Sequence, residues 1–192
     1  MMKRLILASA SPRRHELLTA AGIPHTVLTA DTDESLPDGI LPQDAVQMLS
    51  ARKAAAVLPL APAGSVILAA DTVVALDGKI LGKPRNAENA RQMLSALSGR
   101  SHHVYTGVTL TDGKKTVTAF GETAVKMRNI SPEEIAAYIA TGEPMDKAGA
   151  YGIQGRAALF AVGIDGDYAN VVGLPVSLVG EILRKDFQFP LF

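Results

Sequence analysis

The chain has 192 residues, with 19 basic and 19 acidic side chains and a formal net charge of zero. This balance argues against general binding to nucleic acid or to an anionic membrane, because both need an excess of positive charge. No cysteine is present, which excludes a disulfide framework, a thiol nucleophile and a thiolate metal site. The length fits a single domain over residues 1–192 with a sizeable core.

The N-terminus resembles a secretory signal at first sight, because two basic residues precede a short apolar run and the small residues at 8–10. The apolar run is shorter than the roughly 7–15 residues that such a signal needs, and a charged segment follows at once. No stretch reaches the about 18 apolar residues of a membrane span. We therefore expect a first strand at this point, no membrane partner and a cytoplasmic protein.

Apolar runs bounded by glycine, proline and polar residues predict the strands. They are expected at 4–8, 25–30, 65–70, 72–76, 79–81, 103–111, 115–128 and 158–164. Asp-Gly pairs at 77–78 and 112–113 predict tight hairpin turns.

Apolar residues at helical spacing, with capping residues before them, predict the helices. They are expected at 12–21, 42–58, 86–97, 131–141 and 174–185, with loops at 31–38, 143–155 and 165–173. Strands and helices mix without strict alternation. This order predicts an α/β fold, with a mixed twisted sheet and flanking helices rather than a regular doubly wound sheet.

The start of the first predicted helix has an unusual charge pattern. Ser11 is a natural N-cap and Pro12 a natural first helical residue, but Arg13 and Arg14 follow in the first turn. There the helix dipole repels each cation by roughly 0.3–1 kcal/mol. A phosphate would reverse this effect, because each arginine hydrogen bond to it contributes about 1.5–3 kcal/mol and backbone N–H groups add to that. The segment is either a polyphosphate cradle or a pair of solvated arginines.

Two acidic positions are candidates for chemistry. Asp71 interrupts an apolar run, where a charge is costly unless a cation or a metal partners it. We interpret it as an acid at a strand end, where ligands of α/β sheets gather, and the alternative is an Asp that turns the chain. Glu34 lies in an acidic loop with Asp31 and Asp33. It is either a ligand for a hard cation or a solvated acid.

Three further positions could contact a ligand. Lys83 lies between a glycine and a proline, which would hold its ammonium in one direction, and Lys53 lies on the polar side of a long helix. Both also fit ordinary surface lysines. Gln154 lies in the glycine-rich segment 143–155 and can present a donor and an acceptor together. The alternative is an irregular connection without a ligand.

Other catalytic constellations find little support. His102 and His103 would face opposite sides of a strand, so they make a poor metal pair. Ser9 and Ser11 have no Ser-His-Asp setting in view. The remaining set of hard acids and isolated cations suits metal-assisted phosphoryl chemistry, since Mg²⁺ takes one or two carboxylates plus phosphate oxygens.

Several short motifs occur in order along nearly the whole chain. They are Ser9-Ala10-Ser11-Pro12-Arg13-Arg14, Asp33-Glu34, Lys53-Ala54, Ala70-Asp71-Thr72-Val73-Val74, Gly82-Lys83-Pro84, Leu97-Ser98-Gly99 with His102, Thr106-Gly107, Glu143-Pro144 with Asp146-Lys147-Ala148-Gly149, and Asn170-Val171-Val172-Gly173-Leu174-Pro175. This ordered set closely resembles the Maf family of nucleoside triphosphate pyrophosphatases.

The resemblance implies hydrolysis of a nucleoside triphosphate to the monophosphate and pyrophosphate, with Mg²⁺ or Mn²⁺ as the divalent cation. It also implies a fold like that of the inosine triphosphate pyrophosphatases, with two lobes around a central cleft. Asp71 would be the proton acceptor that activates water, and Glu34 would support the metal or that water. Both acids would thus contact the metal. The residues that would bind the phosphates are Ser11, Arg14, Lys53 and Lys83, and the two lysines would also serve catalysis.

One branch of the family favours dTTP and UTP, and another favours 7-methyl-GTP. The positions that separate them fall at Arg13, Thr72 and Gln154, and all three resemble the dTTP/UTP branch. The resemblance therefore implies a housecleaning enzyme of the nucleotide pool and a possible homodimer. The alternatives are a 7-methyl-GTP pyrophosphatase, or a nucleotide-binding inhibitor of septum formation that acts without catalysis.

Overall fold

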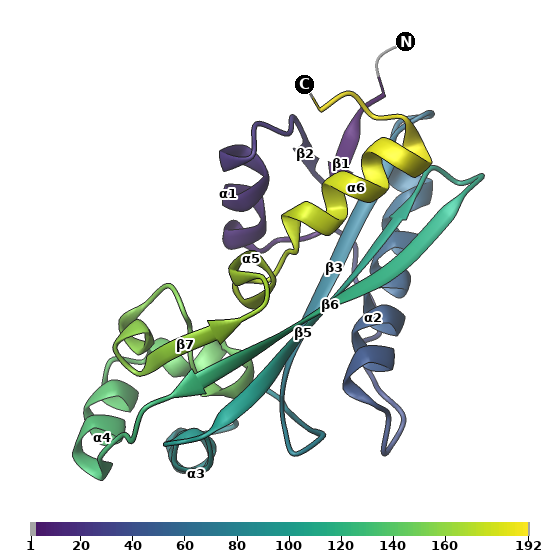
Figure 1. Ribbon diagram of the computed structural model, residues 1–192. Coiled ribbons are helices and arrows are strands. Elements are labelled where there is room, and N and C mark those ends of the chain that lie inside the picture. The colour runs from purple at the N-terminus through teal and green to yellow at the C-terminus, as the bar shows by residue number, and fades with distance from the viewer. Residues whose placement is uncertain (1–2, 192) are drawn as a thin grey trace.

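The structure is a computed structural model that describes residues 3–191 of the chain. A seven-stranded mixed sheet runs through it, in the order β2-β1-β3-β5-β6-β7, with β4 paired to β3 outside this path (Figure 1). The strands are β1 (Leu5–Leu7), β2 (Thr26–Val27), β3 (Val66–Leu76), β4 (Lys79–Leu81), β5 (Ser101–Thr111), β6 (Thr116–Met127) and β7 (Ala161–Asp165). β1 pairs in parallel with β2 and β3, and the other pairs are antiparallel. The mixed α/β class is confirmed.

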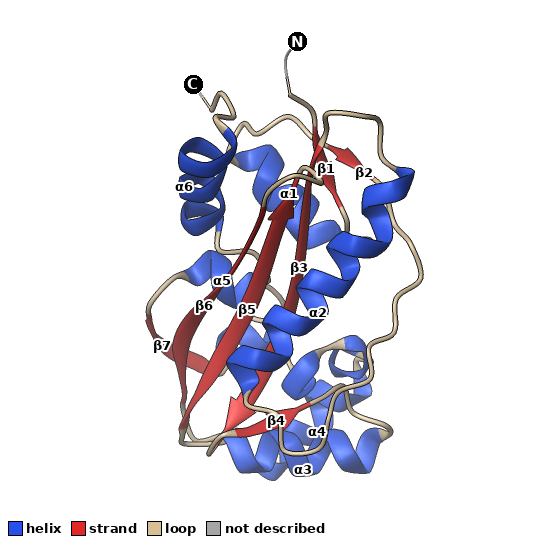
Figure 2. Ribbon diagram, turned by 90° about the vertical axis from the view of Figure 1, so that its right-hand side faces the viewer, coloured by secondary structure: helices blue, strands red, loops and turns tan. Residues whose placement is uncertain are grey.

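Helices cover both faces of this sheet. The α-helices are α1 (Pro12–Ala20), α2 (Pro42–Val57), α3 (Ala87–Leu97), α4 (Pro132–Ala140), α5 (Tyr168–Val172) and α6 (Val176–Phe187). α2 lies on one face, and α1, α5 and α6 lie on the other (Figures 1 and 2). Within residues 3–191, no helix is long and apolar enough to cross a membrane.

β1 and the first half of β3 are buried on both faces of the sheet. Along β1, Leu5 and Leu7 pack with Leu18 of α1 and with α6, whereas Ile6 packs with Ala54 of α2. β3 alternates in the same way, since successive side chains of a strand point to opposite faces. Each fully buried aliphatic side chain contributes about 1.5–3 kcal/mol to folding. These two cores form what we call the first lobe.

A third core forms the second lobe, which contains α3, α4 and a run of short 3₁₀-helices. The 3₁₀-helices in this part of the chain are Glu143–Asp146, Ala148–Ala150 and Arg156–Leu159. β3, β5 and β6 are long enough to pass through both lobes, so the lobes share one sheet (Figure 2). The predicted two-lobe arrangement is therefore present.

α2 lies unusually close to the sheet, at a glycine of β5. A Cβ on Gly107 would lie 2.3 Å from the carbonyl oxygen of Val46, which is far below a normal contact. Gly107 pairs directly with Asp71 across the β3–β5 ladder, and directly paired residues face the same side of a sheet. The glycine therefore lets α2 approach the face that carries Asp71.

Several predicted elements differ from the structure. The strand expected at 25–30 is only Thr26–Val27, because it is an outer strand with both residues exposed. The loop expected at 165–173 contains α5, where the Asp167 side chain accepts the N–H of Ala169 and caps the helix. The strand expected at 158–164 begins only at Ala161, since a 3₁₀-turn precedes it. The helix expected at 174–185 is displaced to Val176–Phe187.

The two strands expected on either side of Asp71 are one continuous strand. β5 pairs with β3 without a break from Ile67 to Ala75, so the carboxylate does not interrupt the ladder. Asp71 therefore does not lie at the end of its own strand. Charge alone does not end a strand whose backbone stays hydrogen-bonded on the other side.

Candidate active site

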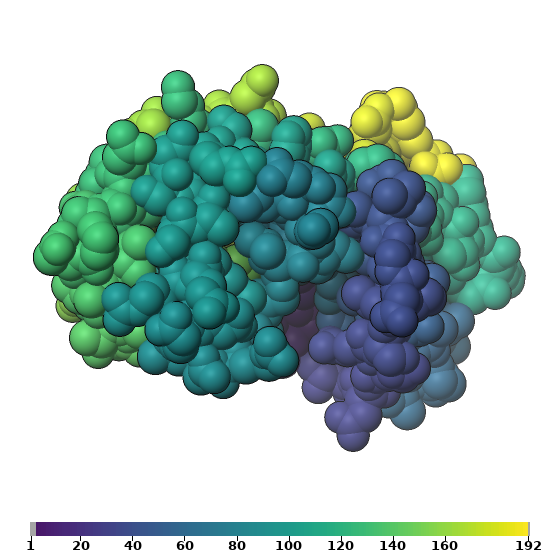
Figure 3. Space-filling view, turned by 90° about the horizontal axis from the view of Figure 1, so that it is seen from below, coloured from purple at the N-terminus to yellow at the C-terminus, as the bar shows by residue number. Residues whose placement is uncertain are grey.

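A cavity of about 730 Å³ lies between the two lobes. Figure 3 shows the hollow between the teal residues around β4 and the blue residues of the first lobe. The residues that the sequence singled out all line it: Ser11, Arg13, Arg14, Glu34, Lys53, Asp71, Thr72, Lys83 and Gln154. The structure thus brings together every residue of the expected site.

The cavity opens where one edge of β3 has no neighbouring strand. β1 accompanies β3 only as far as Leu68, and β4 joins the same strand at Val74. Asp71 and Thr72 occupy the gap between them and alternate across the sheet. The carboxyl end of the short parallel strand β1 thus creates the opening, as is typical of ligand sites in α/β proteins.

Lys53 forms the centre of a group of three charges that includes Asp71. Lys53 Nζ lies 2.6 Å from Asp71 Oδ1 and 2.7 Å from Glu34 Oε1, so one ammonium joins two carboxylates from different parts of the chain. The side chains of Asp71 and Lys53 are 14% and 19% exposed, against 63% for Glu34. Its hydrogen bond to Lys53 lowers the pKa of Glu34. Lys53 therefore holds the two carboxylates near one point and favours the ionised form of Glu34.

Arg14 is fixed in place by neutral acceptors. It donates from Nη1 to Ser9 Oγ at 3.0 Å, from Nη2 to Thr72 Oγ1 at 3.2 Å and from Nε to the carbonyl oxygen of Gly173 at 2.8 Å. Burial lowers the pKa of its guanidinium, and the charge of Asp71 opposes this effect. The hypothesis of a solvated arginine is wrong for Arg14. Because Nη1 and Nη2 each carry another N–H, the guanidinium can still bind an anion.

Ser11 begins α1 as expected, but its hydroxyl makes no capping hydrogen bond. Instead its backbone N–H donates to Ser9 Oγ at 3.2 Å. The Ser11 hydroxyl is therefore free for a ligand at the start of the helix. Ser9 was not among the expected site residues, although its place in the Ser9-to-Arg14 motif was a signal for it.

Lys83 follows β4 on the far side of the opening, and its side chain is exposed. Among the described residues, no carboxylate lies within ion-pair distance of its ammonium. The positive charge of Lys83 nevertheless contributes to the lowered pKa of Glu34. Lys83 is thus available to a negatively charged ligand.

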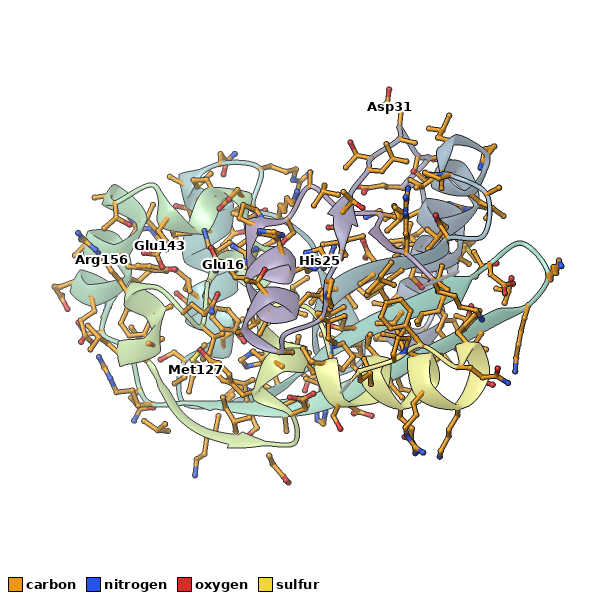
Figure 4. The ribbon with its side chains drawn as sticks, turned by 90° about the horizontal axis from the view of Figure 1, so that it is seen from above. Glu16, His25, Asp31, Met127, Glu143 and Arg156 are labelled. Carbon is orange, nitrogen blue, oxygen red and sulfur yellow. The ribbon has the colours of Figure 1, made fainter. Side chains whose placement is uncertain are left out.

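Gln154 is exposed on the segment that leads from the 3₁₀-helices to β7. Glu143 holds this segment, because its carboxylate accepts the N–H of Arg156 at 3.1 and 3.2 Å and the hydroxyl of Tyr138 at 3.0 Å (Figure 4). A Cβ at Gly155 would lie 2.1 Å from Glu143 Oε1. The glycine is therefore needed for this close approach. Glu143 belongs to one of the sequence motifs, but nothing in the motif predicts this role.

A buried hydrogen bond to Tyr151 also holds the segment that carries Gln154. His102 Nε2 and the hydroxyl of Tyr151 are 2.7 Å apart, and Tyr151 lines the cavity. His102 is 1% exposed, and burial lowers its pKa to about 4, so the ring is neutral. His103 faces the opposite side of β5 and contacts Glu122. The predicted opposition of the two histidines is confirmed.

The donor chemistry of the cavity fits a hard divalent cation. Glu34 and Asp71 are two carboxylates that approach the same point, and Mg²⁺ is commonly held by one or two carboxylates plus substrate phosphates. Within residues 3–191, no group of three or more His, Cys, Asp or Glu side chains forms a complete metal site. Asp33 turns away and accepts hydrogen bonds from Ser35 instead. A metal here would need oxygen ligands from the substrate.

Curated relatives match almost the whole chain. The dTTP/UTP pyrophosphatase of Symbiobacterium thermophilum is 50% identical over 191 residues, which cover 100% of this chain and 97% of the relative. The proteins of the same name from Pelotomaculum thermopropionicum and Moorella thermoacetica are 47% and 50% identical, over 96% and 95% of this chain and 97% and 94% of their own.

Solved structures resemble the chain more loosely. The Staphylococcus aureus Ham1 protein is 14% identical over 65% of this chain and 72% of its own, with a TM-score of 0.47. Protein VC0702 from Vibrio cholerae is 9% identical over 99% and 100%, also with a TM-score of 0.47. Similarity at this level does not bear on the site.

The family model described as Maf-like protein matches residues 4–186. This match begins before β1 and ends within α6, so it spans both lobes and the cavity. Together with relatives that are about half identical over their full length, it assigns the family: the chain belongs to the Maf family.

Proposed function

We propose that this protein hydrolyses dTTP and UTP to the nucleoside monophosphate and pyrophosphate. The observation that carries the proposal is the convergence of the Asp71 carboxylate with three cations, Arg14, Lys53 and Lys83, in one cavity. An acid beside several cations suits the attack of water on a polyphosphate. Relatives with about 50% identity, named dTTP/UTP pyrophosphatases, support the same activity.

The triphosphate would bind where the cations meet. Arg14 is already oriented by Ser9, Thr72 and the Gly173 carbonyl, so little side-chain entropy is lost when a phosphate binds. The free N–H groups at the start of α1 and the Ser11 hydroxyl would add donors. The like charges of Arg13 and Arg14 in the first helical turn are unfavourable without an anion. A polyphosphate would turn this into a favourable arrangement.

Asp71 would act as the general base. Its Oδ1 is held by Lys53, and Oδ2 accepts no hydrogen bond from the described residues, which leaves that oxygen for a water molecule. Asp71 takes a proton from the water as the water oxygen attacks the α-phosphorus in line. The bond between the α-phosphorus and the bridging oxygen breaks, and pyrophosphate leaves with the electron pair. The cations stabilise the negative charge that develops on the phosphates.

We propose a divalent cation, Mg²⁺ or Mn²⁺, as the cofactor. Glu34 and Asp71 would hold it together with phosphate oxygens. When bound, such an ion draws negative charge from the phosphates and orients them. Lys53, which joins the two acids, would keep the Glu34 carboxylate ionised for the ion as well.

Gln154 would recognise the base. Thymine and uracil present an N3–H donor beside an O4 acceptor, and a primary amide can match both. Guanine presents donors at N1 and N2, which a carboxylate would match better. The cavity is also lined by apolar groups, among them Leu81, Val171 and Val172, against which a pyrimidine ring can pack.

The test is pyrophosphate release from a panel of nucleoside triphosphates, measured with and without Mg²⁺. The panel contains dTTP, UTP, dCTP, dGTP and 7-methyl-GTP. We expect the highest kcat/KM for dTTP and UTP, and loss of activity after chelation of the metal. A preference for 7-methyl-GTP would contradict the assignment of the base. Tight nucleotide binding without turnover would indicate a binding protein and contradict the proposal as a whole.

A further inference from the structure

A second cavity of about 780 Å³ adjoins the first, and none of the proposed steps uses its outer part. The two cavities share five lining residues: Ser11, Arg14, Glu34, Lys53 and Lys83. Asp71 and Gln154 line only the first cavity, whereas Thr29 and Asp31 line only the second. The shared cations therefore lie between a compartment for the base and a second compartment.

This division gives the triphosphate a direction. The base and the α-phosphorus belong to the first cavity, because Gln154 and the attacking acid Asp71 lie there. The β- and γ-phosphates then lie among the shared cations, and the γ-phosphate points toward the second cavity. The end of the substrate that carries the γ-phosphate is therefore not enclosed, because the second cavity continues beyond the shared cations.

The outer part of the second cavity is suited to a neutral group. Besides the shared residues, its lining contains one charged side chain, Asp31, and small or hydroxyl-bearing residues such as Thr29 and Ala30. The cations that line this cavity, Arg14, Lys53 and Lys83, are all shared with the first cavity, so its outer part adds no cation that would bind a further phosphate. In Figure 4 the labelled Asp31 points away from the molecule, so its exposed carboxylate does not occupy this space. Ligand pockets commonly have volumes of about 300–1,000 Å³, so the space can hold a small organic group.

We infer that the enzyme also accepts nucleoside triphosphates that carry a neutral organic group, linked as an ester, on the γ-phosphate. This inference rests on the proposed function and extends its substrate class. Water bonds to the α-phosphorus, the bond to the α,β-bridging oxygen breaks, and the γ-substituted diphosphate leaves with the electron pair. The proton of the water passes to Asp71. The products are the nucleoside monophosphate and a diphosphate monoester, and no other reactant is needed.

The test compares dTTP with its γ-phenyl ester in the presence of Mg²⁺, with the products separated by chromatography. We expect dTMP and phenyl diphosphate from the ester, with kcat/KM within about tenfold of that for dTTP. Hydrolysis of dTTP without hydrolysis of the ester would overturn the inference and leave the proposed function intact. Hydrolysis of neither compound would overturn both. Release of dTDP and phenyl phosphate would also overturn the inference, because the attack would then be at another phosphorus.

A variant tests whether the phenyl group occupies the second cavity. Thr29→Trp fills the outer part with a bulky ring, and Thr29 is exposed, so the fold has room for the change. We expect kcat/KM for the ester to fall at least about tenfold while that for dTTP changes little. Val27→Trp is the matched control, since Val27 is 47% exposed on the neighbouring strand and does not line the cavity. Equal effects of Thr29→Trp on both substrates would contradict the placement.

Faster hydrolysis of thymidine tetraphosphate than of the phenyl ester would contradict the neutral character of the outer part. We expect the tetraphosphate to be the poorer substrate, because the outer part of the second cavity adds no cation that would bind its terminal phosphate.

Discussion

The two sides of the cleft are built in different ways. On the side where we propose that the phosphates bind, called the phosphate side below, the charged groups lie on or directly beside regular elements: Arg14 on α1, Lys53 on α2 and Asp71 within β3. On the side proposed for the base, called the base side, Gln154 lies on a segment of short 3₁₀-turns that is held by side-chain contacts from Glu143 and Tyr151.

Because of this difference, we expect the phosphate side to govern the rate of hydrolysis and the base side to govern which nucleotide binds. Groups on packed strands and helices keep their geometry, which the attack on phosphorus requires. A segment that is anchored at a few points can change its sequence without disturbing the sheet. Changes on the phosphate side should therefore lower turnover for every nucleotide, and changes on the base side should alter which nucleotide binds.

The largest effect is expected from Asp71→Asn. The amide keeps the size of the side chain but cannot take a proton from water, so kcat for dTTP should fall by about 10²–10⁴-fold. Binding of dTTP, measured by calorimetry in Ca²⁺ or without metal, should weaken much less. An Asn variant with native turnover would remove Asp71 from the role of base.

Glu143→Ala removes the anchor of the base-side segment. Loss of the hydrogen bonds to the Arg156 N–H and the Tyr138 hydroxyl should raise KM for dTTP by about tenfold or more, because each hydrogen bond to a charged group contributes about 1.5–3 kcal/mol. We expect kcat to change less, since the phosphate side is intact. Glu133→Ala, an exposed acid on α4 outside the cavity, is the control. A fall in kcat at constant KM would contradict a positioning role.

Gln154→Glu tests the recognition of the base more narrowly. The carboxylate lacks the donor for O4, so kcat/KM for dTTP and UTP should fall by about tenfold, the cost of roughly one hydrogen bond. The ratio of dGTP to dTTP hydrolysis should rise in the same variant. If the nucleotide preference stays the same, Gln154 does not read the base.

The support beneath the base side should depend on pH. Burial lowers the pKa of His102 to about 4, so the unfolded chain binds a proton between pH 6.5 and 4 that the folded protein does not. Stability therefore falls as pH falls through this window, by up to about 3 kcal/mol. Urea unfolding at several pH values measures this slope, and His102→Phe should flatten it. An equal slope in the variant would assign the effect to other groups.

Most of the regular elements could be predicted from the sequence. The helices expected at 86–97 and 131–141 are α3 and α4, with Asn86 and Ser131 as their N-caps, and the Asp112-Gly113 turn joins β5 to β6 as predicted. These signals are local, since each depends on residues a few positions apart. The wrong predictions concern positions where pairing partners decide. β3 continues through Asp71 because β5 holds its backbone, and no local signal shows this.

The family resemblance named more of the residues that line this cavity than the residues alone did, and their proposed roles stay predictions. On the residues, Arg14, Lys53 and Glu34 each had an ordinary surface interpretation, because their proximity arises only when α1, α2 and the acidic loop meet at the β3 edge. The contacts of Glu143 and His102 that hold the segment around Gln154 were not predicted. Their roles depend on contacts with Arg156 and Tyr151 that spacing does not reveal.

The position of attack is tested most directly by following the oxygen atom of the attacking water into the products. Hydrolysis of dTTP in water enriched in heavy oxygen, followed by mass spectrometry of both products, shows which phosphorus was attacked. With Asp71 beside the α-phosphorus, the label should appear in dTMP and be absent from pyrophosphate. Label in pyrophosphate would place the attack on the β-phosphorus and contradict the arrangement of the acid and the cations proposed for this cleft.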